Sequence, residues 1–379
     1  MSVKPIRILF VATVVKTHIM AFHIPFLKML KEMGYETAVA ARNDYDNPED
    51  CHIPYCDQYF DIPFHREPFH FDNIQCYKKL KSIIDEGDFS VVHCHTPVAS
   101  VLGRLAARNA RKAGSRIMYT AHGFHFYKGA PIQNWLLYYT AEKFCAHFTD
   151  VLITINKEDY VLAQKKMKAK CVKYVPGVGI DIEKFSHSSI DKAAKRRELG
   201  IPEDAVLLLS VGELNNNKNH ETVIRAIANM DVYYIIAGNG DLREHLEHII
   251  ATLGLVDRVK LLGFRSDVKE LYGAADIFVF PSFREGLPVA LLEAMASGLP
   301  CVVSNIRGIN DLLENTEGGF LCNPRNVSEF TDRLNLLISD PSLCEKMGQN
   351  NMKAIQEFRM DRVVNEMRSI YAAELLDNK

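Results

Sequence analysis

Short apolar runs rich in β-branched residues alternate with stretches of helical period through the first half of the chain. Runs of this length, separated by amphipathic stretches, predict β-strands joined by helices. Strands that alternate with helices form a parallel sheet with helices on both faces. The expected strands are Ile6–Val15, Thr37–Ala40, Val91–His93, Ile117–Ala121 and Val151–Ile155, and the expected helices are Ala21–Met33, Ile74–Asp85, Val98–Ala113 and Ile132–Ala146.

The same pattern starts again after KYVPGVGIDIEKF, a segment whose turn residues predict a connection near Pro176–Asp181. The fold class is therefore α/β, with two doubly wound parallel-sheet domains expected at residues 1–178 and 179–359. Open α/β sheets bind ligands at the carboxyl ends of their strands, so the facing edges of two such domains would form a ligand cleft. The strands expected in the second domain are Ala205–Val211, Tyr233–Ala237, Val259–Leu262, Ile277–Phe280 and Cys301–Ser304.

The final stretch, Met360–Leu376, has the period of an amphipathic helix. Two positions are open to it. It could close the second domain, or residues 360–379 could cross back and pack on the first.

Composition adds limits on the class of protein. With 379 residues the chain is too long for one ordinary core, and its formal net charge of −2 argues against a general nucleic-acid binder. No apolar run approaches the roughly 20 residues of a membrane helix. The first apolar stretch, residues 6–15, lacks a small-residue cleavage site and predicts a strand rather than a signal peptide. The nine cysteines form no C-x-x-C pair, which indicates a reduced, cytoplasmic protein.

Charge differs between the two halves. Residues 1–180 hold 23 Lys and Arg against 17 Asp and Glu, a net +6, and the remainder carries −8. An excess of positive charge favours an anionic substrate or an anionic membrane surface. We therefore expect a cytoplasmic protein, either free or peripheral at the inner face of the membrane. Ordinary charge scatter explains the same numbers equally well.

A second carboxylate stands inside an otherwise apolar run in REGLPVALLEAMASGLPCVVS, residues 284–304. The pattern predicts a strand, a short loop that holds Glu285, and a helix that begins at Pro288 and ends at Gly298. Glu293 leans toward the helix N-terminus, where backbone N–H groups can bind phosphate, and it could accept hydrogen bonds from a ribose. The two carboxylates would lie about 10 Å apart, farther than the ~5 Å of a retaining glycosidase pair. A solvated glutamate on a helix flank is the alternative.

The pair Glu285 and Glu293, as E-x7-E within FVFPSFREGLPVALLEAMASGLPCV, resembles the signature of glycosyltransferase family 4. The similarity covers nearly the whole chain, is most specific over residues 261–304, and is greatest to the branch that builds capsular and extracellular polysaccharides. The resemblance implies GT-B architecture, with two Rossmann-like domains facing a central cleft, and a retaining transfer from a nucleotide-sugar. It implies that Glu285 acts on the donor sugar and that Glu293 contacts the ribose. The other donor contacts that it implies include Gly212, Gly286, Leu287 and Pro288.

A second element, SVGELNNNKNHETVIRA at residues 210–226, predicts a strand, a polar turn and a helix. A cation at Lys218 would stabilise the donor's diphosphate as it leaves, and the resemblance gives Lys218 this catalytic role. A solvated lysine is the alternative. The family has Arg where Glu213 stands and Gly where Asn219 stands, so the second cation of the pattern has no counterpart here.

Two further loops belong to the second domain. Arg265, in GFRSDV, is the candidate for the missing cation, and the backbone of this loop, with Phe264, is expected to frame the nucleotide base. The segment AGNGDLREHL holds Gly238 and Gly240 after a strand. It does not form a G-x-G-x-x-G fingerprint and predicts a plain turn.

Histidines end two strands of the first domain, in YTAHGFHF (residues 119–126) and VVHCHTP. The resemblance places His122 beside the donor sugar and the leaving phosphate and implies a catalytic role, with a hydrogen-bonded strand-end histidine as the alternative. His93, His95 and His125 are equally open to a structural or an acceptor-side role. Their spacing implies no metal geometry.

The first loop, ATVVKTH at residues 12–18, lacks the glycine-rich turn that the family often has, and its Lys16 or His18 could serve the donor or the acceptor. The aromatic stretch GAPIQNWLLYYTAEKF, residues 129–144, suits either core packing or a membrane interface and lipid-linked acceptor. Asp44-x-Asp46 superficially resembles a metal-binding D-x-D motif. The GT-B class generally needs no bound metal, so we expect no metal and no cofactor beyond the nucleotide-sugar substrate.

These observations predict a retaining glycosyltransferase that moves a hexosyl residue from a nucleotide-sugar, with uridine favoured by resemblance, to a growing glycan that is lipid-linked. Its partners would be the donor and the acceptor, with no nucleic acid. Two alternatives stay open. A nucleotide-sugar epimerase of the same architecture would release a new free nucleotide-sugar, and a non-catalytic nucleotide-sugar-binding protein would bind the donor without turnover.

Overall fold

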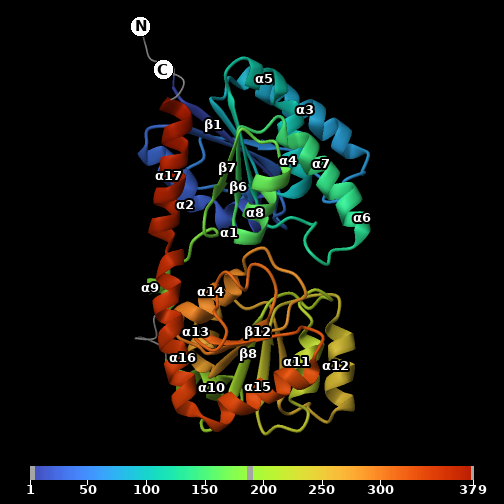
Figure 1. Ribbon diagram of the computed structural model, residues 1–379, viewed down its shortest axis with the longest axis vertical. Coiled ribbons are helices and arrows are strands. Elements are labelled where there is room, and N and C mark those ends of the chain that lie inside the picture. Colours follow the sequence, from blue (N-terminus) through green and yellow to red (C-terminus); the bar gives the residue numbers. More distant parts are fainter. Residues whose placement is uncertain (1–4, 186–190, 377–379) are drawn as a thin grey trace. The chain divides into compact units, whose positions relative to one another are not determined.

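The structure of the protein is a computed structural model that describes residues 5–185 and 191–376 (Figure 1). The chain divides into two compact units. The first consists of Met1–Gly179 together with Met360–Lys379, and the second of Ile180–Arg359. The chain therefore enters the second unit at Ile180 and returns to the first for its final helix.

The first unit is built on a sheet of seven parallel strands in the order β3-β2-β1-β4-β5-β6-β7. Successive residues of a strand point to opposite faces, and in β1 both sets are buried: Leu9 and Val11 on one face, Ile8 and Phe10 on the other. A strand buried on both faces is almost continuously apolar, as this sequence is. The strands are β1 (Arg7–Val14), β2 (Glu36–Arg42), β3 (Gln58–Asp61), β4 (Val91–Cys94), β5 (Arg116–Ala121), β6 (Val151–Thr154) and β7 (Cys171–Tyr174).

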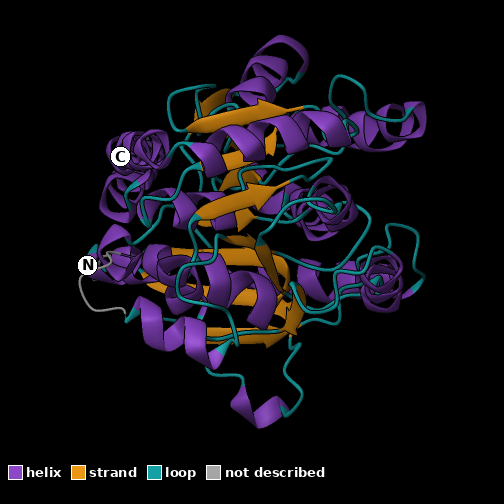
Figure 2. Cartoon of the chain, turned by 90° about the horizontal axis from the view of Figure 1, so that it is seen from below, coloured by secondary structure: helices purple, strands orange, loops and turns teal. Residues whose placement is uncertain are grey.

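Helices cover both faces of this sheet (Figure 2). One face packs against α3 and α4, and the other against α2 and α17. The helices are α1 (Met20–Phe22), α2 (Ile24–Glu32), α3 (Asp72–Gly87), α4 (Pro97–Ala106), α5 (Arg108–Lys112), α6 (Ile132–Asn134), α7 (Thr140–Ala146), α8 (Lys157–Lys166) and α17 (Met360–Leu376), with the 3-10 turn η2 (Pro48–Asp50) and π-helical turns at η1 (Val15–Ile19) and η3 (Trp135–Tyr139).

The final helix, whose position the sequence left open, packs on the first unit. Figure 1 shows α17 beside α2, and Arg368 of α17 pairs with Glu32 of α2 at 3.3 Å. Buried Tyr371 reaches the sheet, where its hydroxyl lies 2.6 Å from Nδ1 of His93 on β4. A helix from the far end of the sequence thus completes the core of the first unit.

The second unit has six parallel strands in the order β10-β9-β8-β11-β12-β13, and its core again lies on both faces of the sheet. The strands are β8 (Leu207–Val211), β9 (Tyr233–Ala237), β10 (Val259–Gly263), β11 (Ile277–Phe280), β12 (Cys301–Ser304) and β13 (Gly319–Cys322). The helices are α9 (Ile182–Phe185), α10 (Lys192–Glu198), α11 (His220–Ala226), α12 (Arg243–Thr252), α13 (Val268–Ala274), α14 (Val289–Ala296), α15 (Val327–Ser339) and α16 (Pro341–Ala354), followed by the 3-10 turn η4 (Ile355–Phe358).

The predicted α/β class with two Rossmann-like sheets is confirmed, and the differences concern edges and helix starts. The sequence missed β3, β7 and β13, which are edge strands; β3 and β7 are half-exposed and carry no continuous apolar run. The helix expected over Ala21–Met33 is divided at His23 into α1 and α2, and Pro25 lies in the first turn of α2, where proline is well tolerated.

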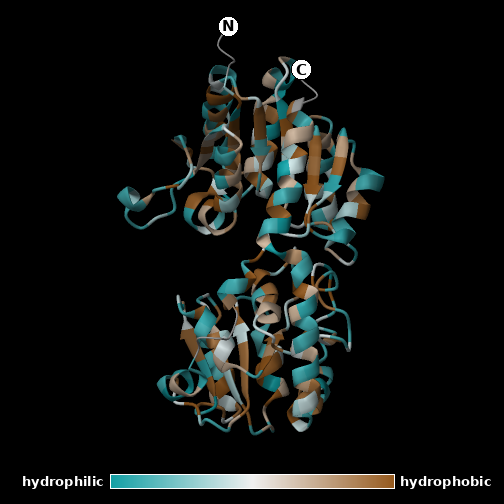
Figure 3. Cartoon of the chain, turned by 90° about the vertical axis from the view of Figure 1, so that its left-hand side faces the viewer, coloured by the Kyte–Doolittle hydropathy of each residue, from teal (hydrophilic) through white to brown (hydrophobic). Residues whose placement is uncertain are grey.

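Hydropathy follows this layering in each unit. Figure 3 shows apolar strands inside layers of helices that carry polar residues on their outer faces. Within the described residues, no helix combines the length and the apolar character required to cross a membrane.

A buried ion pair ties two helices of the first unit together. Arg104 of α4 and Glu142 of α7 are almost fully buried, and Nη2 of the arginine lies 2.8 Å from the carboxylate. The hydroxyl of Tyr119 on β5 donates to the same carboxylate at 3.1 Å, and the guanidinium lies 4.0 Å from the centre of the tyrosine ring. Removing one partner would leave the other charge buried without compensation.

Arg104→Met is expected to lower the free energy of unfolding of the first unit by about 3–5 kcal/mol, because Glu142 loses its counter-ion. Urea denaturation followed by the fluorescence of Trp135, the only tryptophan, reports on this unit. Lys81→Met is the matched control, since it breaks the partly exposed pair with Asp85 and should cost less than about 0.5 kcal/mol. Equal losses in the two variants would contradict the importance of the buried pair.

Candidate active site

Most of the predicted site residues lie at the carboxyl ends of β8 and β11 in the second unit. These strands are neighbours, although β9 and β10 separate them in sequence. The strand order reverses between them, which makes their carboxyl edge the usual ligand-binding place of an open α/β sheet. The loop after β8 carries Gly212 and Lys218, and the loop after β11 carries Glu285 and leads into α14.

Lys218 and Glu285, far apart in sequence, form an ion pair at this edge. Nζ of Lys218 lies 2.8 Å from Oε1 of Glu285, and both side chains are mostly buried. The ammonium also lies 4.7 Å from the centre of the Phe280 ring. A Cβ on Gly212 would approach the lysine stem at 3.2 Å, so the glycine leaves room for it. The ammonium is thus held in place while it keeps further N–H donors for anionic oxygens.

Asparagines tie the polar turn after β8 to the loop after β11. Asn217 exchanges hydrogen bonds with that loop: its side chain donates to the carbonyl of Arg284 at 2.9 Å, and its own carbonyl accepts from Phe283 at 2.8 Å. Asn219 adopts a left-handed backbone (φ 55°, ψ 34°) and donates to the carbonyl of Pro281 at 3.0 Å. Asparagine tolerates this conformation better than most residues other than glycine. The structure therefore explains why Asn219 can stand where the family has glycine.

The loop that holds Glu285 packs closely against the loop after β12. Pro288 is the N-cap of α14 with an extended backbone (φ −77°, ψ 115°), so the helix starts one residue later than predicted. Gly308, in the loop after β12, has φ +77°, and a Cβ there would lie 2.1 Å from the carbonyl oxygen of Gly286. Leu287 packs partly buried against the core. Sequence reasoning missed Gly308, because nothing along the chain indicates which loop it meets.

Glu293 lies on α14, and its carboxylate accepts a hydrogen bond of 3.0 Å from the hydroxyl of buried Tyr272 on α13. The same hydroxyl is 2.9 Å from the carbonyl of Ala290. Burial raises the pKa of Glu293, and the hydrogen bond from Tyr272 and the charge of Lys184 oppose that rise. Tyr272 thus orients the carboxylate predicted to contact ribose. No feature of the sequence indicated this contact, because the tyrosine comes from another helix.

Arg265, the candidate for the second cation, is paired with two carboxylates. The Arg265 guanidinium bonds Asp267 at 2.7 Å through Nε and Glu198 at 3.0 Å through Nη2. The backbone N–H of the neighbouring Phe264 donates to the side chain of Asn239 at 3.1 Å. Phe264 is 78% exposed, so its ring is open to stack on a base. Exposed Glu213 accepts a hydrogen bond from the side chain of Asn215 at 2.8 Å.

His122, the remaining predicted catalytic residue, belongs to the first unit and follows β5. Its Nε2 lies 3.3 Å from Nδ1 of His95, which follows β4. Burial lowers the pKa of His122 to about 4, so the ring is neutral at neutral pH. His93 has structural partners, since its ring bonds Thr120 at 2.8 Å as well as Tyr371.

The other sequence candidates have local partners. Nζ of Lys16 pairs with Asp46 at 3.3 Å, and Asp44 accepts a hydrogen bond from the Thr17 hydroxyl at 2.9 Å, so the Asp44-x-Asp46 carboxylates bind groups of η1. His125 stacks on Tyr138 with ring centres 4.6 Å apart. In the aromatic stretch, Trp135 packs against Phe126 and the core, whereas Ile132 and Leu136 are exposed.

Glu293→Gln is expected to stabilise the second unit at neutral pH. The folded pKa of Glu293 lies above its unfolded value near 4.5, so the stability that this carboxyl contributes is present below 4.5 and is lost as pH rises through the folded pKa. Glutamine is neutral throughout and can still accept the hydrogen bond from Tyr272. Thermal melting between pH 4 and 8 should show an advantage of the variant that grows with pH. Exposed Glu244→Gln is the control, and a less stable Glu293→Gln variant at pH 8 would contradict the prediction.

Comparison with known proteins identifies the family of this chain. Residues 191–354 match the family described as Glycosyl transferases group 1, and residues 7–156 match the family described as Glycosyl transferase 4-like. A putative glycosyltransferase, EpsD of Bacillus subtilis (strain 168), is 40% identical over 381 residues and covers 98% of both chains. An Escherichia coli UDP-Gal:alpha-D-GlcNAc-diphosphoundecaprenol alpha-1,3-galactosyltransferase is 32% identical over 316 residues, 79% of this chain and 81% of its own.

Solved structures share the fold. Anabaena HepE, in complex with UDP and glucose, superposes with a TM-score of 0.81 at 21% identity and covers 97% of this chain and 100% of its own. WaaG, a glycosyltransferase involved in lipopolysaccharide biosynthesis, gives a TM-score of 0.75 at 17% identity over 96% of this chain and 99% of its own. The chain has two Rossmann-like sheets, an E-x7-E motif that runs from a loop into α14, and a glycosyltransferase relative that covers 98% of it. The protein is therefore an enzyme of GT-B fold that belongs to glycosyltransferase family 4.

Proposed function

We propose that this enzyme transfers a hexosyl residue from a UDP-sugar to a growing, lipid-linked surface glycan with retention of anomeric configuration. The observation that carries the proposal is the 2.8 Å ion pair between Lys218 and Glu285 where the loops after β8 and β11 meet. A cation and a carboxylate side by side suit the two parts of a nucleotide-sugar, its diphosphate and its sugar hydroxyls. The Escherichia coli relative is named for a UDP-Gal donor and a diphosphoundecaprenol acceptor, which supports both halves of the proposal.

In the proposed donor complex, Lys218 and the N–H groups at the start of α14 bind the diphosphate. Glu285 accepts hydrogen bonds from the sugar hydroxyls, and Glu293, oriented by Tyr272, accepts them from the ribose. Negative charge on the diphosphate grows as the glycosidic bond breaks, so donors fixed beforehand stabilise the transition state more than the ground state. Exposed Phe264 offers a ring for the base.

The chemistry that fits these residues is front-face substitution. The acceptor hydroxyl attacks on the side from which the diphosphate leaves, and a phosphate oxygen takes the acceptor proton, so no side chain is the nucleophile. His122, neutral because burial lowers its pKa to about 4, is assigned to the donor sugar and the leaving phosphate. A neutral imidazole can donate an N–H to an oxygen of the donor without adding charge.

The acceptor is assigned to the first unit, which contains a pocket of about 280 Å³. Its lining includes Thr13, His18, Arg66, Thr96, His125 and Tyr138. Two segments of this lining also carry exposed apolar side chains nearby in sequence: Phe69 and Phe71 follow Arg66, and Ile132 and Leu136 precede Tyr138. Segments that combine exposed apolar residues with a cation suit a lipid-linked phosphate and a peripheral contact with the membrane.

Lys218→Ala is expected to lower kcat by about 100- to 1,000-fold, with little change in the KM for the donor, because the lost charge acts mainly on the leaving diphosphate. Steady-state assays with a UDP-sugar and a lipid-diphosphate-linked acceptor measure both constants. Lys192→Ala, which breaks a 2.7 Å pair with Asp276 in the same unit, is the control and should match the wild type. Wild-type activity in the Lys218 variant would remove this residue from the mechanism.

Thermal stabilisation by a panel of UDP-, GDP-, ADP- and CDP-sugars tests the donor directly. We expect UDP-sugars alone to raise the melting temperature, and Glu293→Ala to weaken UDP binding by about 1–3 kcal/mol through lost hydrogen bonds to the ribose. Selective stabilisation by GDP-sugars would replace uridine in the proposal. If a new free nucleotide-sugar forms without an acceptor, the protein is an epimerase. If the donor binds and no turnover follows, the protein is a nucleotide-sugar-binding protein.

A further inference from the structure

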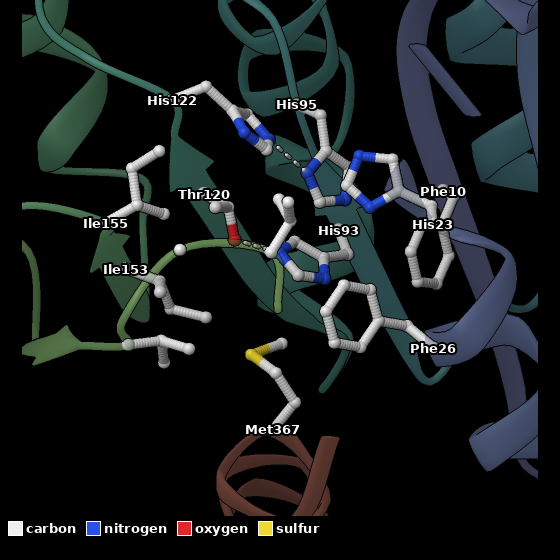
Figure 4. A pocket seen from close by; sticks show the side chains of 13 residues that line it. Phe10, His23, Phe26, His93, His95, Thr120, His122, Ile153, Ile155 and Met367 are labelled. Carbon is white, nitrogen blue, oxygen red and sulfur yellow. Dashed lines mark hydrogen bonds between the residues drawn. The ribbon is translucent and has the colours of Figure 1, made fainter. Parts of the chain in front are cut away.

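Four histidines from separate segments of the first unit converge at the carboxyl edge of its sheet. His18 lies on η1 after β1, His23 precedes α2, His95 follows β4 and His122 follows β5. One ring nitrogen of each lies within 4.8 Å of one from every other. Figure 4 shows three of these rings, His23, His95 and His122, with the ring of His93 below them.

The distances within the cluster are those of a metal site. Nε2 of His18 lies 3.1 Å from Nε2 of His23, and Nδ1 of His95 lies 3.3 Å from Nε2 of His122. In a tetrahedral zinc site with Zn–N bonds of about 2.0–2.1 Å, the nitrogens are about 3.3 Å apart. Two pairs have about this separation, and one ligand atom of each ring lies within 4.8 Å of one from each of the other three.

Each ring has one contact within the cluster, and these contacts leave two ring nitrogens unsatisfied. Among the described residues, Nδ1 of His23 and Nε2 of His95 are buried without a partner. The cluster contains no carboxylate that could hold a proton on a ring. Burial lowers the pKa of His122 to about 4 and those of the other three histidines well below their ordinary value, so all four are neutral at pH 7. Neutral imidazole is the form that binds metal ions.

Neighbouring side chains position the four rings, and adjoining pockets give an ion access to them. Phe10 stacks on His95 with ring centres 5.3 Å apart, and His93, held by Thr120 and Tyr371, lies 4.2 Å from His95. A cavity of about 20 Å³ lined by His23, His93, His95 and His122 adjoins the cluster. His18 also lines the larger pocket assigned to the acceptor, so an ion can reach the rings from that side.

We propose that His18, His23, His95 and His122 together bind one divalent transition-metal ion of the zinc class. Four neutral nitrogen ligands select Zn²⁺ and its neighbours over Mg²⁺ and Ca²⁺, which require oxygen ligands. The site lies in the first unit, whereas the donor diphosphate is assigned to residues of the second. Its consequence is positional: the ion fixes the ring of His122 and joins η1 to the ends of β4 and β5.

Metal binding by the tag-free full-length enzyme tests the proposal. The chain is stripped with a chelator, loaded with Zn²⁺ or Co²⁺, desalted and examined by elemental analysis and visible absorption. We expect one ion per chain, absorption bands of tetrahedral Co²⁺, and a higher unfolding midpoint from Trp135 fluorescence when Zn²⁺ is present. His23→Gln combined with His95→Gln should weaken Zn²⁺ binding at least about 100-fold.

The control removes a second, more exposed group, His65 and His70 beside Asp72, whose ligand atoms are equally close together. His65→Gln with His70→Gln should keep full occupancy. If circular dichroism shows that the His23/His95 variant does not fold, His18→Gln, at a half-buried position, replaces it and should also weaken binding. Three results would each overturn the proposal: the wild type holds no ion, only the His65/His70 control loses its ion, or bound Co²⁺ gives an octahedral spectrum. UDP binding by the same samples separates this result from a failure of the proposed function.

Discussion

Parallel strand pairing is the constraint on which the rest of this structure depends. All strands of each sheet run in one direction and both faces are covered by helices, so their carboxyl ends meet at one edge. The loops that follow them must meet there too. This is why Lys218, after β8, contacts Glu285, after β11, and why His95, after β4, contacts His122, after β5. In each unit the candidate functional side chains lie where the carboxyl ends of the strands meet.

The two edges differ in charge but share one physical effect. Burial disfavours the charged form of any ionisable group. In the second unit it raises the pKa of Glu293, and in the first it lowers the pKa of His122. The donor edge opposes this effect with an ammonium and a tyrosine hydroxyl, which suit a ligand that carries charge and hydroxyl groups. At the histidine edge no group among the described residues opposes the effect of burial on these rings, and neutral nitrogens suit a cation.

Contacts around the site explain one of its two local departures from the family pattern. Asn219 occupies a left-handed position that usually requires glycine, and its amide binds the carbonyls of Pro281 and Pro324. The replacement therefore keeps the backbone path and adds a tie between loops. Glu213 has no comparable compensation, since its described partner is Asn215 beside it and Arg265 is paired with Asp267 and Glu198.

The sequence by itself determined the fold class and the core strands of both sheets, and it predicted which residues bind the donor. Short continuous apolar runs and the E-x7-E spacing are local properties of the chain, and they are visible without coordinates. Edge strands such as β3 were not predicted, because a half-exposed strand carries little of that apolar pattern. Only the tertiary structure decided that α17 completes the first unit, that Tyr272 orients Glu293, and that four histidines converge. Each is a contact between segments far apart in the chain, where distance is set by strand order rather than by spacing along the sequence.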